Sequence, residues 1–208
     1  TYGSSVRVGS SLDCYLNSVR LLNEKGYQIL LCGDILLSQS IFHEFKGMFV
    51  DYKTLGVNQD IFNLYAALEV DLFIGEAGGG IFLPSLNNIP RLYINAFPYF
   101  NGMTNCWLHY KTMRDSKSHT LIPLQEILTK YAYESAERAI PGMKICCNSA
   151  EEILEAISTF LVDIQNPESA TQEQALNLTF PKDIWFQYTS TKISPAFLKL
   201  YSKEGMPI

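Results

Sequence analysis

The chain has 208 residues, of which 47% are hydrophobic and 18% charged, and its formal net charge is −5. This balance is typical of a folded globular protein, and the length allows one large domain with a sizeable core. The acidic balance argues against a general nucleic-acid binder, which would carry a basic patch. The apolar runs are far shorter than the roughly 20 residues that cross a bilayer, so we expect no membrane-spanning helix.

In the first half of the chain, helical and strand patterns alternate. Helical spacing of apolar residues predicts helices over residues 12–25, 39–45 and 58–69, and short apolar runs predict strands over 27–32, 48–50, 71–75 and 91–95. The helix 58–69 can be capped by Asn58 or Asp60. Its apolar residues share one face, as in an amphipathic helix that faces a core: Ile61, Leu64, Tyr65 and Leu68. This alternation favours an α/β fold, in which a parallel sheet carries helices on its faces.

The second half is less regular. Residues 96–118 are rich in aromatic residues, Asn and Gly, and we expect them to form a long loop or lid. The patterns predict helices over 124–138, 149–164 and 195–201 and a short strand over 143–147, with Ser149 and Glu152 as a capping box. We expect residues 1–165 to form one domain and residues 166–208 a helical tail that packs on it.

The three consecutive glycines Gly78, Gly79 and Gly80 follow the predicted strand 71–75 and open a predicted helix. Backbone N–H groups there are unobstructed, which suits a phosphate at a helix N-terminus. The turn has neither the Gly-Lys-Ser/Thr of a P-loop nor the GxGxxG of a dinucleotide site. The simpler alternative is a flexible turn that lets the helix pack closely on the strand.

Other polar residues stand where ligands bind in open α/β sheets. Glu76 and Asn95 follow predicted strands, as do Gly33 and Asp34, which share the same sheet edge if the strands are parallel. Glu76 suits ribose or sugar hydroxyls and Asp34 suits a base or ribose, whereas Arg7, just before the first helix, suits a phosphate. Each also has a simpler interpretation as a turn residue, a surface ion-pair partner or part of a loop that covers the core.

Other catalytic patterns are weak. The five cysteines lack CxxC spacing and the three histidines are isolated, so we expect no metal site and a reducing, cytoplasmic compartment. His109 is either a general base in the expected lid or a buried, hydrogen-bonded side chain. The chain begins at Thr1, and we expect it to be a fragment or a processed form of a longer protein.

Several of these elements recur together in one known family. The matching residues, in order, are Arg7, Ser10, Asp13-x-Tyr15, Gly26-Tyr27-x-Ile29-Leu30-x-x-Gly33-Asp34, Val70-Asp71-x-Phe73-Ile74-Gly75, and Asn88-Ile89-Pro90-Arg91-Leu92-x-x-Asn95-x-x-Pro98. Across roughly residues 7–165 the chain resembles bacterial glycosyltransferases that are found with surface-polysaccharide genes. More broadly, it is similar to the C-terminal, donor-binding half of GT-B glycosyltransferases.

The resemblance implies a Rossmann-like domain over residues 1–165 with additional C-terminal helices. It implies transfer of a sugar, without a metal or a cofactor, from a nucleotide-diphosphate sugar to a saccharide or lipid-linked acceptor. The implied donor-binding residues are Gly78, Gly79, Gly80, Glu76, Gly33, Asp34, Arg7 and Asn95. An N-terminal acceptor-binding domain, with the unidentified catalytic base, would lie outside this chain, and the enzyme would act in the cytoplasm or at the inner face of the membrane.

Two alternatives remain open. One is a non-catalytic Rossmann-like interaction domain in which the glycine turn is merely structural. The other is a different nucleotide-sugar enzyme, such as an epimerase or a hydrolase.

Overall fold

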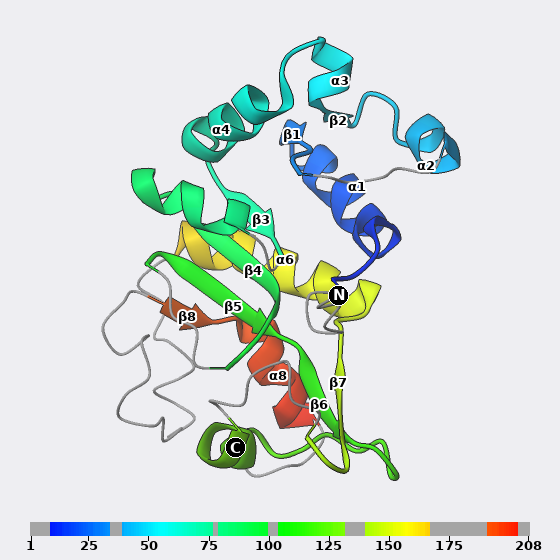
Figure 1. The fold of residues 1–208 in the computed structure, drawn as a ribbon, viewed down its shortest axis with the longest axis vertical. Helices are drawn as coiled ribbons and strands as arrows, with labels where there is room; N and C mark the ends of the chain where they lie inside the picture. The colour runs from blue at the N-terminus through cyan, green and yellow to red at the C-terminus, as the bar shows by residue number, and fades with distance from the viewer. Residues whose placement is uncertain are drawn as a thin grey trace.

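The structure is a computed structural model, and it describes residues 9–33, 39–76, 79–99, 104–131, 140–166 and 191–203. These residues form an α/β fold around a parallel four-stranded sheet in the order β3-β4-β5-β8 (Figure 1). The four strands are Phe73–Gly75, Arg91–Ala96, Cys106–Tyr110 and Thr191–Ile193. Such a sheet is compatible with a Rossmann-like architecture.

The two central strands are buried along their whole length, because helices cover both faces of the sheet. On one face, α6 (Ala150–Gln165) and α1 (Leu16–Glu24) pack against Leu92, Ile94 and Trp107. The rings of Trp107 and Phe160 meet edge to face, with their centroids 5.1 Å apart.

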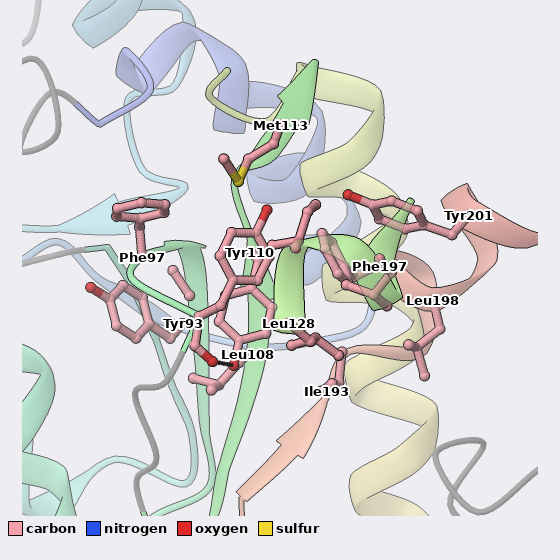
Figure 2. Close-up of a cluster of buried hydrophobic side chains, with 14 of the residues drawn as sticks. Tyr93, Phe97, Leu108, Tyr110, Met113, Leu128, Ile193, Phe197, Leu198 and Tyr201 are labelled. Carbon is pink, nitrogen blue, oxygen red and sulfur yellow. Dashed lines mark hydrogen bonds between the residues drawn. The ribbon is translucent and has the colours of Figure 1, made fainter. Parts of the chain in front are cut away.

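The opposite face holds an aromatic cluster (Figure 2). Leu108 and Tyr110 of β5 lie beside Phe197 of α8 (Pro195–Lys203), and Tyr93 of β4 lies on the other side of the cluster, near Phe97. The short helical segments α5 (Leu124–Glu126) and η3 (Ile127–Tyr131) close the cluster. Because β8 pairs with β5 and α8 packs on α6, the region 166–208 supplies a strand as well as a helix.

The N-terminal region precedes this sheet and lies toward one end of the molecule in Figure 1. Its helical elements are η1 (Leu12–Tyr15), α1, α2 (Gln39–Glu44), α3 (Tyr52–Leu55) and α4 (Gln59–Glu69). Its two strands, β1 (Ile29–Leu30) and β2 (Phe49–Val50), form a separate parallel pair. The sequence led us to expect β1 in the same parallel sheet as β3 and β4. In the described residues, β1 instead forms hydrogen bonds to β2 alone.

A 3-10 helix and a two-stranded ribbon connect the strands of the sheet to the rest of the fold. The 3-10 helix η2 (Gly79–Asn87) connects β3 to β4 and packs against α4. The antiparallel ribbon β6 (Thr112–Asp115) and β7 (Met143–Cys146) continues from β5 and leads into α6. Within the described residues, no helix is both long and apolar enough to cross a membrane.

Several local predictions are confirmed. Ser149 and Glu152 form the reciprocal capping box of α6, and the Asn58 side chain caps α4 by accepting from the N–H groups of Asp60 and Ile61. The described helices and strands of the first half follow the predicted order, except that the short helix α3 (Tyr52–Leu55) was not predicted.

Two expectations are wrong. The described residues of the stretch 96–118 do not form a lid, because β5 and β6 lie among them and β5 is an inner strand of the sheet. The predicted apolar face of α4 is not in the core: Ile61, Leu64 and Tyr65 are exposed, whereas Phe62 and two alanines of the same helix are buried. The small alanine face is the one that allows close packing against the neighbouring elements.

Candidate functional site

Polar side chains from four parts of the chain meet at the carboxyl edge of the sheet. Glu76 directly follows β3, and Asn95 lies near the end of the neighbouring parallel strand β4. Asn148 follows β7, and Ser10 and Tyr15 come from the segment before α1. Hydrogen bonds connect all five residues, which we call the sheet-edge network.

The carboxylate of Glu76 is the centre of the network. The backbone N–H of Ser10 donates to both of its oxygens at 3.1 Å, and the Tyr15 hydroxyl donates to Oε1. The side-chain amide of Asn95 donates to Oε1 at 2.9 Å. Hydrogen bonds to a charged acceptor are stronger than neutral ones, so this half-buried carboxylate ties the segment before α1 to the sheet.

Gly9 makes this close approach possible. A Cβ atom added at position 9 would lie 1.7 Å from Oε2 of Glu76, far inside van der Waals contact. A larger residue would therefore displace either the segment or the Glu76 carboxylate, so these hydrogen bonds depend on glycine at this position.

Asn95 and Asn148 hold each other through reciprocal bonds. The backbone N–H of Asn95 donates to Oδ1 of Asn148 at 2.9 Å, and the backbone N–H of Asn148 donates to Oδ1 of Asn95 at 2.7 Å. The Asn148 amide also donates to the carbonyl of Tyr110 at 2.9 Å. Both asparagines are buried, so these bonds satisfy groups that water does not reach.

The backbone at Asn95 is unusual. The register of β4 on β5 shifts between Ile94 and Ala96, so Asn95 occupies a bulge, and its φ is +54°. Left-handed backbone is uncommon outside glycine, and asparagine tolerates it better than most residues. Bulges are over-represented next to functional sites, where they redirect a side chain. Here the bulge coincides with an amide that donates to both Glu76 and Ser10.

The setting keeps the neighbouring phenols neutral. Burial, and then the charge of Glu76, raise the pKa of Tyr15 well above its ordinary value. Burial, Cys106 and Glu76 raise the pKa of Tyr93 to about 12. Tyr15 therefore remains a hydrogen-bond donor to Glu76 throughout the physiological pH range.

The structure brings together only some of the residues expected from the sequence. Glu76 and Asn95 join the network, and Gly80 follows in η2, where an added Cβ would meet nothing within 4 Å. Gly79 begins η2. By contrast, the N–H of Gly33 donates to the Asn63 side chain of α4 at 3.2 Å, away from these bonds. Gly78, Asp34 and Arg7 lie outside the described residues.

Sequence reasoning gave no role to three members of the network. Ser10 and Tyr15 belong to the family resemblance, but nothing in the sequence connects them to Glu76, which is more than 60 residues away. Asn148 stands between a short strand and the capping serine Ser149. A polar residue between the end of a strand and the start of a helix was the signal that could have identified Asn148 as a site residue.

His109 lies in β5 and is fully buried. Its Nδ1 is 3.1 Å from the Ser194 hydroxyl, and its ring meets Phe197 edge to face. Burial lowers the pKa of His109 to about 3, so the imidazole is neutral at physiological pH. Of its two interpretations, the buried and hydrogen-bonded side chain is confirmed, because the expected lid is a strand.

The described residues contain no group of three or more His, Cys, Asp or Glu side chains that could hold a metal ion. Comparisons with models of known families, with curated proteins and with solved structures found no match to this chain.

Proposed function

We propose that this chain binds the diphosphate of a nucleotide sugar at the carboxyl edge of its parallel sheet, as the donor-binding half of a glycosyltransferase. The observation that carries the proposal is the convergence of Glu76 and Asn95 beside the turn from β3 into η2. In open α/β sheets, ligands bind outside the carboxyl ends of the strands.

The glycine turn is the proposed phosphate contact. Backbone N–H groups at Gly78, Gly79 and Gly80 would donate to the phosphate oxygens as the chain enters η2. Gly80 is exposed and has open space where a Cβ would stand, so a ligand can approach its backbone closely.

In this proposal Glu76 positions the site and does not itself contact the phosphates. A carboxylate is unfavourable directly against a diphosphate, and protein donors already engage both of its oxygens. By holding Ser10 at the sheet edge, it anchors the residues that follow Arg7 in the sequence. A guanidinium at Arg7 is the proposed second phosphate contact, because its fork binds phosphate oxygens in pairs.

The proposed reaction is a direct displacement at the anomeric carbon of the donor. An acceptor hydroxyl oxygen bonds to that carbon, the bond from the carbon to the diphosphate oxygen breaks, and a nucleoside diphosphate leaves. N–H groups of the glycine turn stabilise the charge that develops on the leaving group, since preorganised donors act without reorganisation. The acceptor proton passes to a base that we place outside this chain.

Calorimetric titration with UDP-, GDP- and ADP-sugars tests the proposal, with CMP-sugars, which carry one phosphate, as a ligand control. We expect one diphosphate sugar to bind and Gly80→Val to weaken its binding by about tenfold or more through steric block of the turn. Leu86→Val, at the exposed far end of the same 3-10 helix, is the matched control and should bind like the wild type.

The proposal fails if none of these sugars binds at millimolar concentration, or if Gly80→Val binds as well as the wild type while keeping its circular dichroism spectrum. The former result favours the alternative, a non-catalytic interaction domain. One observation favours that alternative: Ser10, Tyr15 and Asn95 already donate to the Glu76 carboxylate, so it can hold the segment before α1 on the sheet without a ligand. A purely structural sheet edge would have the same bonds.

A further inference from the structure

Exposed apolar side chains gather in one part of the described chain. Among the described residues eight large hydrophobic side chains are exposed, and all but Val162 fall within residues 55–86. The seven are between 44% and 72% exposed, and we call them the α4 patch: Leu55, Val57, Ile61, Leu64, Tyr65, Phe82 and Leu86. Single exposed apolar residues are normal on a protein surface, whereas a concentration of this kind marks an interaction site.

The helix α4 is apolar on two faces. Its inner face buries Phe62, Ala66 and Ala67 against the rest of the molecule. Its outer face carries Ile61, Leu64 and Tyr65, which are 68%, 49% and 60% exposed and spaced to lie side by side on a helix. A helix that is apolar on opposite faces is typical of one that is covered on both.

The patch extends beyond one helix. The element η2 packs along α4, and the Asn87 side chain donates to the Leu68 carbonyl at 2.8 Å, which joins the ends of the two elements. Phe82 and Leu86 are 57% and 72% exposed on this neighbouring element. On the other side, α3 packs on α4 and adds Leu55.

The exposed area is close to that of an interface. Tyr65 and Phe82 each carry about 150 to 250 Å² and the five aliphatic side chains carry less, so the seven, at 44% to 72% exposure, present on the order of 700 Å². Protein–protein interfaces of standard size bury about 800 Å² on each partner. Once rim residues are added, the α4 patch is therefore large enough for a stable dimer.

We propose that the α4 patch is a homodimer interface, in which two copies of this chain pack their patches together about a two-fold axis. In a two-fold dimer the same surface of each copy meets the other, so the surface must be complementary to itself. A centre of uncharged aliphatic and aromatic side chains meets this requirement. The sequence from Asp51 to Asp71 contains four carboxylates and one lysine. This acidic rim disfavours an anionic membrane surface as the occupant.

The rim gives the dimer a distinctive salt dependence. Two copies bring acidic rims together, so added salt screens their repulsion and strengthens the association. A partner with a basic rim would instead bind more weakly as salt rises. The direction of the salt effect therefore separates a second copy from a basic protein.

Sedimentation velocity of the full chain, from roughly 1 to 100 µM, tests the proposal. We expect the wild type to shift from monomer to dimer with concentration, and to do so at lower concentration in about 500 mM than in about 50 mM NaCl. Ile61→Asp should weaken the dimer by about tenfold or more, because it buries a charge at the centre of the interface. Aspartate in the first turn of α4 suits the helix, so this variant should fold.

Val162→Asp is the matched control, since Val162 is 60% exposed but lies on α6, outside the patch. It should dimerise like the wild type. Leu86→Asp, on η2, provides a second test should Ile61→Asp alter the circular dichroism spectrum, and it too should weaken the dimer. A wild type that is monomeric at every concentration and salt, or a Val162→Asp variant as monomeric as Ile61→Asp, would overturn the proposal. Neither outcome depends on whether a nucleotide sugar binds.

Discussion

The central sheet and the N-terminal region are built from the same kinds of element but are covered to different degrees. Every residue of β4 and β5 is buried, with helices packed on both faces. In β1 and β2, each two residues long, three of the four positions are only half-buried. Parallel strands owe their stability to helices on both sides, and only the central sheet has them in full.

The difference indicates that the two regions have different local stabilities. Segments with few buried apolar contacts open at lower free energy than core strands. The sheet-edge network joins the two regions, because Glu76 follows a strand of the central sheet and its partners Ser10 and Tyr15 belong to the N-terminal region. A ligand at this edge would therefore bind where a rigid part of the molecule meets a more easily opened one.

Matched core substitutions give the most direct test of this comparison. Leu108 in β5 is fully buried, so Leu108→Ala should lower the free energy of unfolding by about 2 to 5 kcal/mol. Leu30→Ala, in the half-buried β1, should cost about 1 kcal/mol. Urea unfolding followed by circular dichroism measures both, and equal losses would mean that the two regions contribute equally to the core.

Removing the charge of Glu76 tests whether the sheet-edge network holds the N-terminal region on the central sheet. Glu76→Gln places a donor group among donors from Ser10, Tyr15 and Asn95, so we expect a loss of about 2 kcal/mol. The matched control is Glu44→Gln, which breaks an exposed ion pair with Arg20 and should cost less than about 1 kcal/mol. Hydrogen exchange should accelerate in α1 for the first variant only, and no such acceleration would show that the network does not hold the N-terminal region.

The buried His109 in the central sheet makes the free energy of unfolding depend on pH. Because the pKa of His109 is lowered from 6.5 to about 3, the unfolded chain binds a proton there that the folded chain does not, and stability falls as the pH drops from 6.5 toward 3. Between pH 7.5 and 5, His109 should account for a loss of about 2 kcal/mol, and His109→Asn should remove that part of the dependence. The exposed His43→Asn variant is the control. Urea unfolding curves at pH 7.5 and pH 5 measure this loss. If the free energy of unfolding depends on pH equally in His109→Asn and in the wild type, the lowered pKa of His109 is not the cause.

Local signals in the sequence were the most informative. The capping box of Ser149 and Glu152 and the cap at Asn58 depend on residues within one turn of each other, and the structure has them as predicted. Glu76 and Asn95 could be placed near one another because parallel strands end at a common edge.

The errors came from contacts that are distant in sequence. The strand Cys106–Tyr110 looked like part of a loop, because what makes it an inner strand is a second partner, β8, that is far away in the sequence. The stripe of Ile61, Leu64 and Tyr65 looked like a core face, but periodicity alone cannot distinguish a buried apolar face from an exposed one. The partners of Glu76 could not be derived, since a single glutamate after a strand does not specify which donors will reach it.

The left-handed backbone at Asn95 narrows what evolution can place there. Glycine would adopt the backbone easily but would lose the amide that contacts Glu76 and Ser10. Aspartate would have the right shape but would bring a second negative charge against the carboxylate. Asparagine both tolerates the left-handed backbone and supplies a neutral amide donor to Glu76. Because that donor is useful only while residue 76 accepts it, positions 76 and 95 should change together, or not at all, among descendants of this sequence.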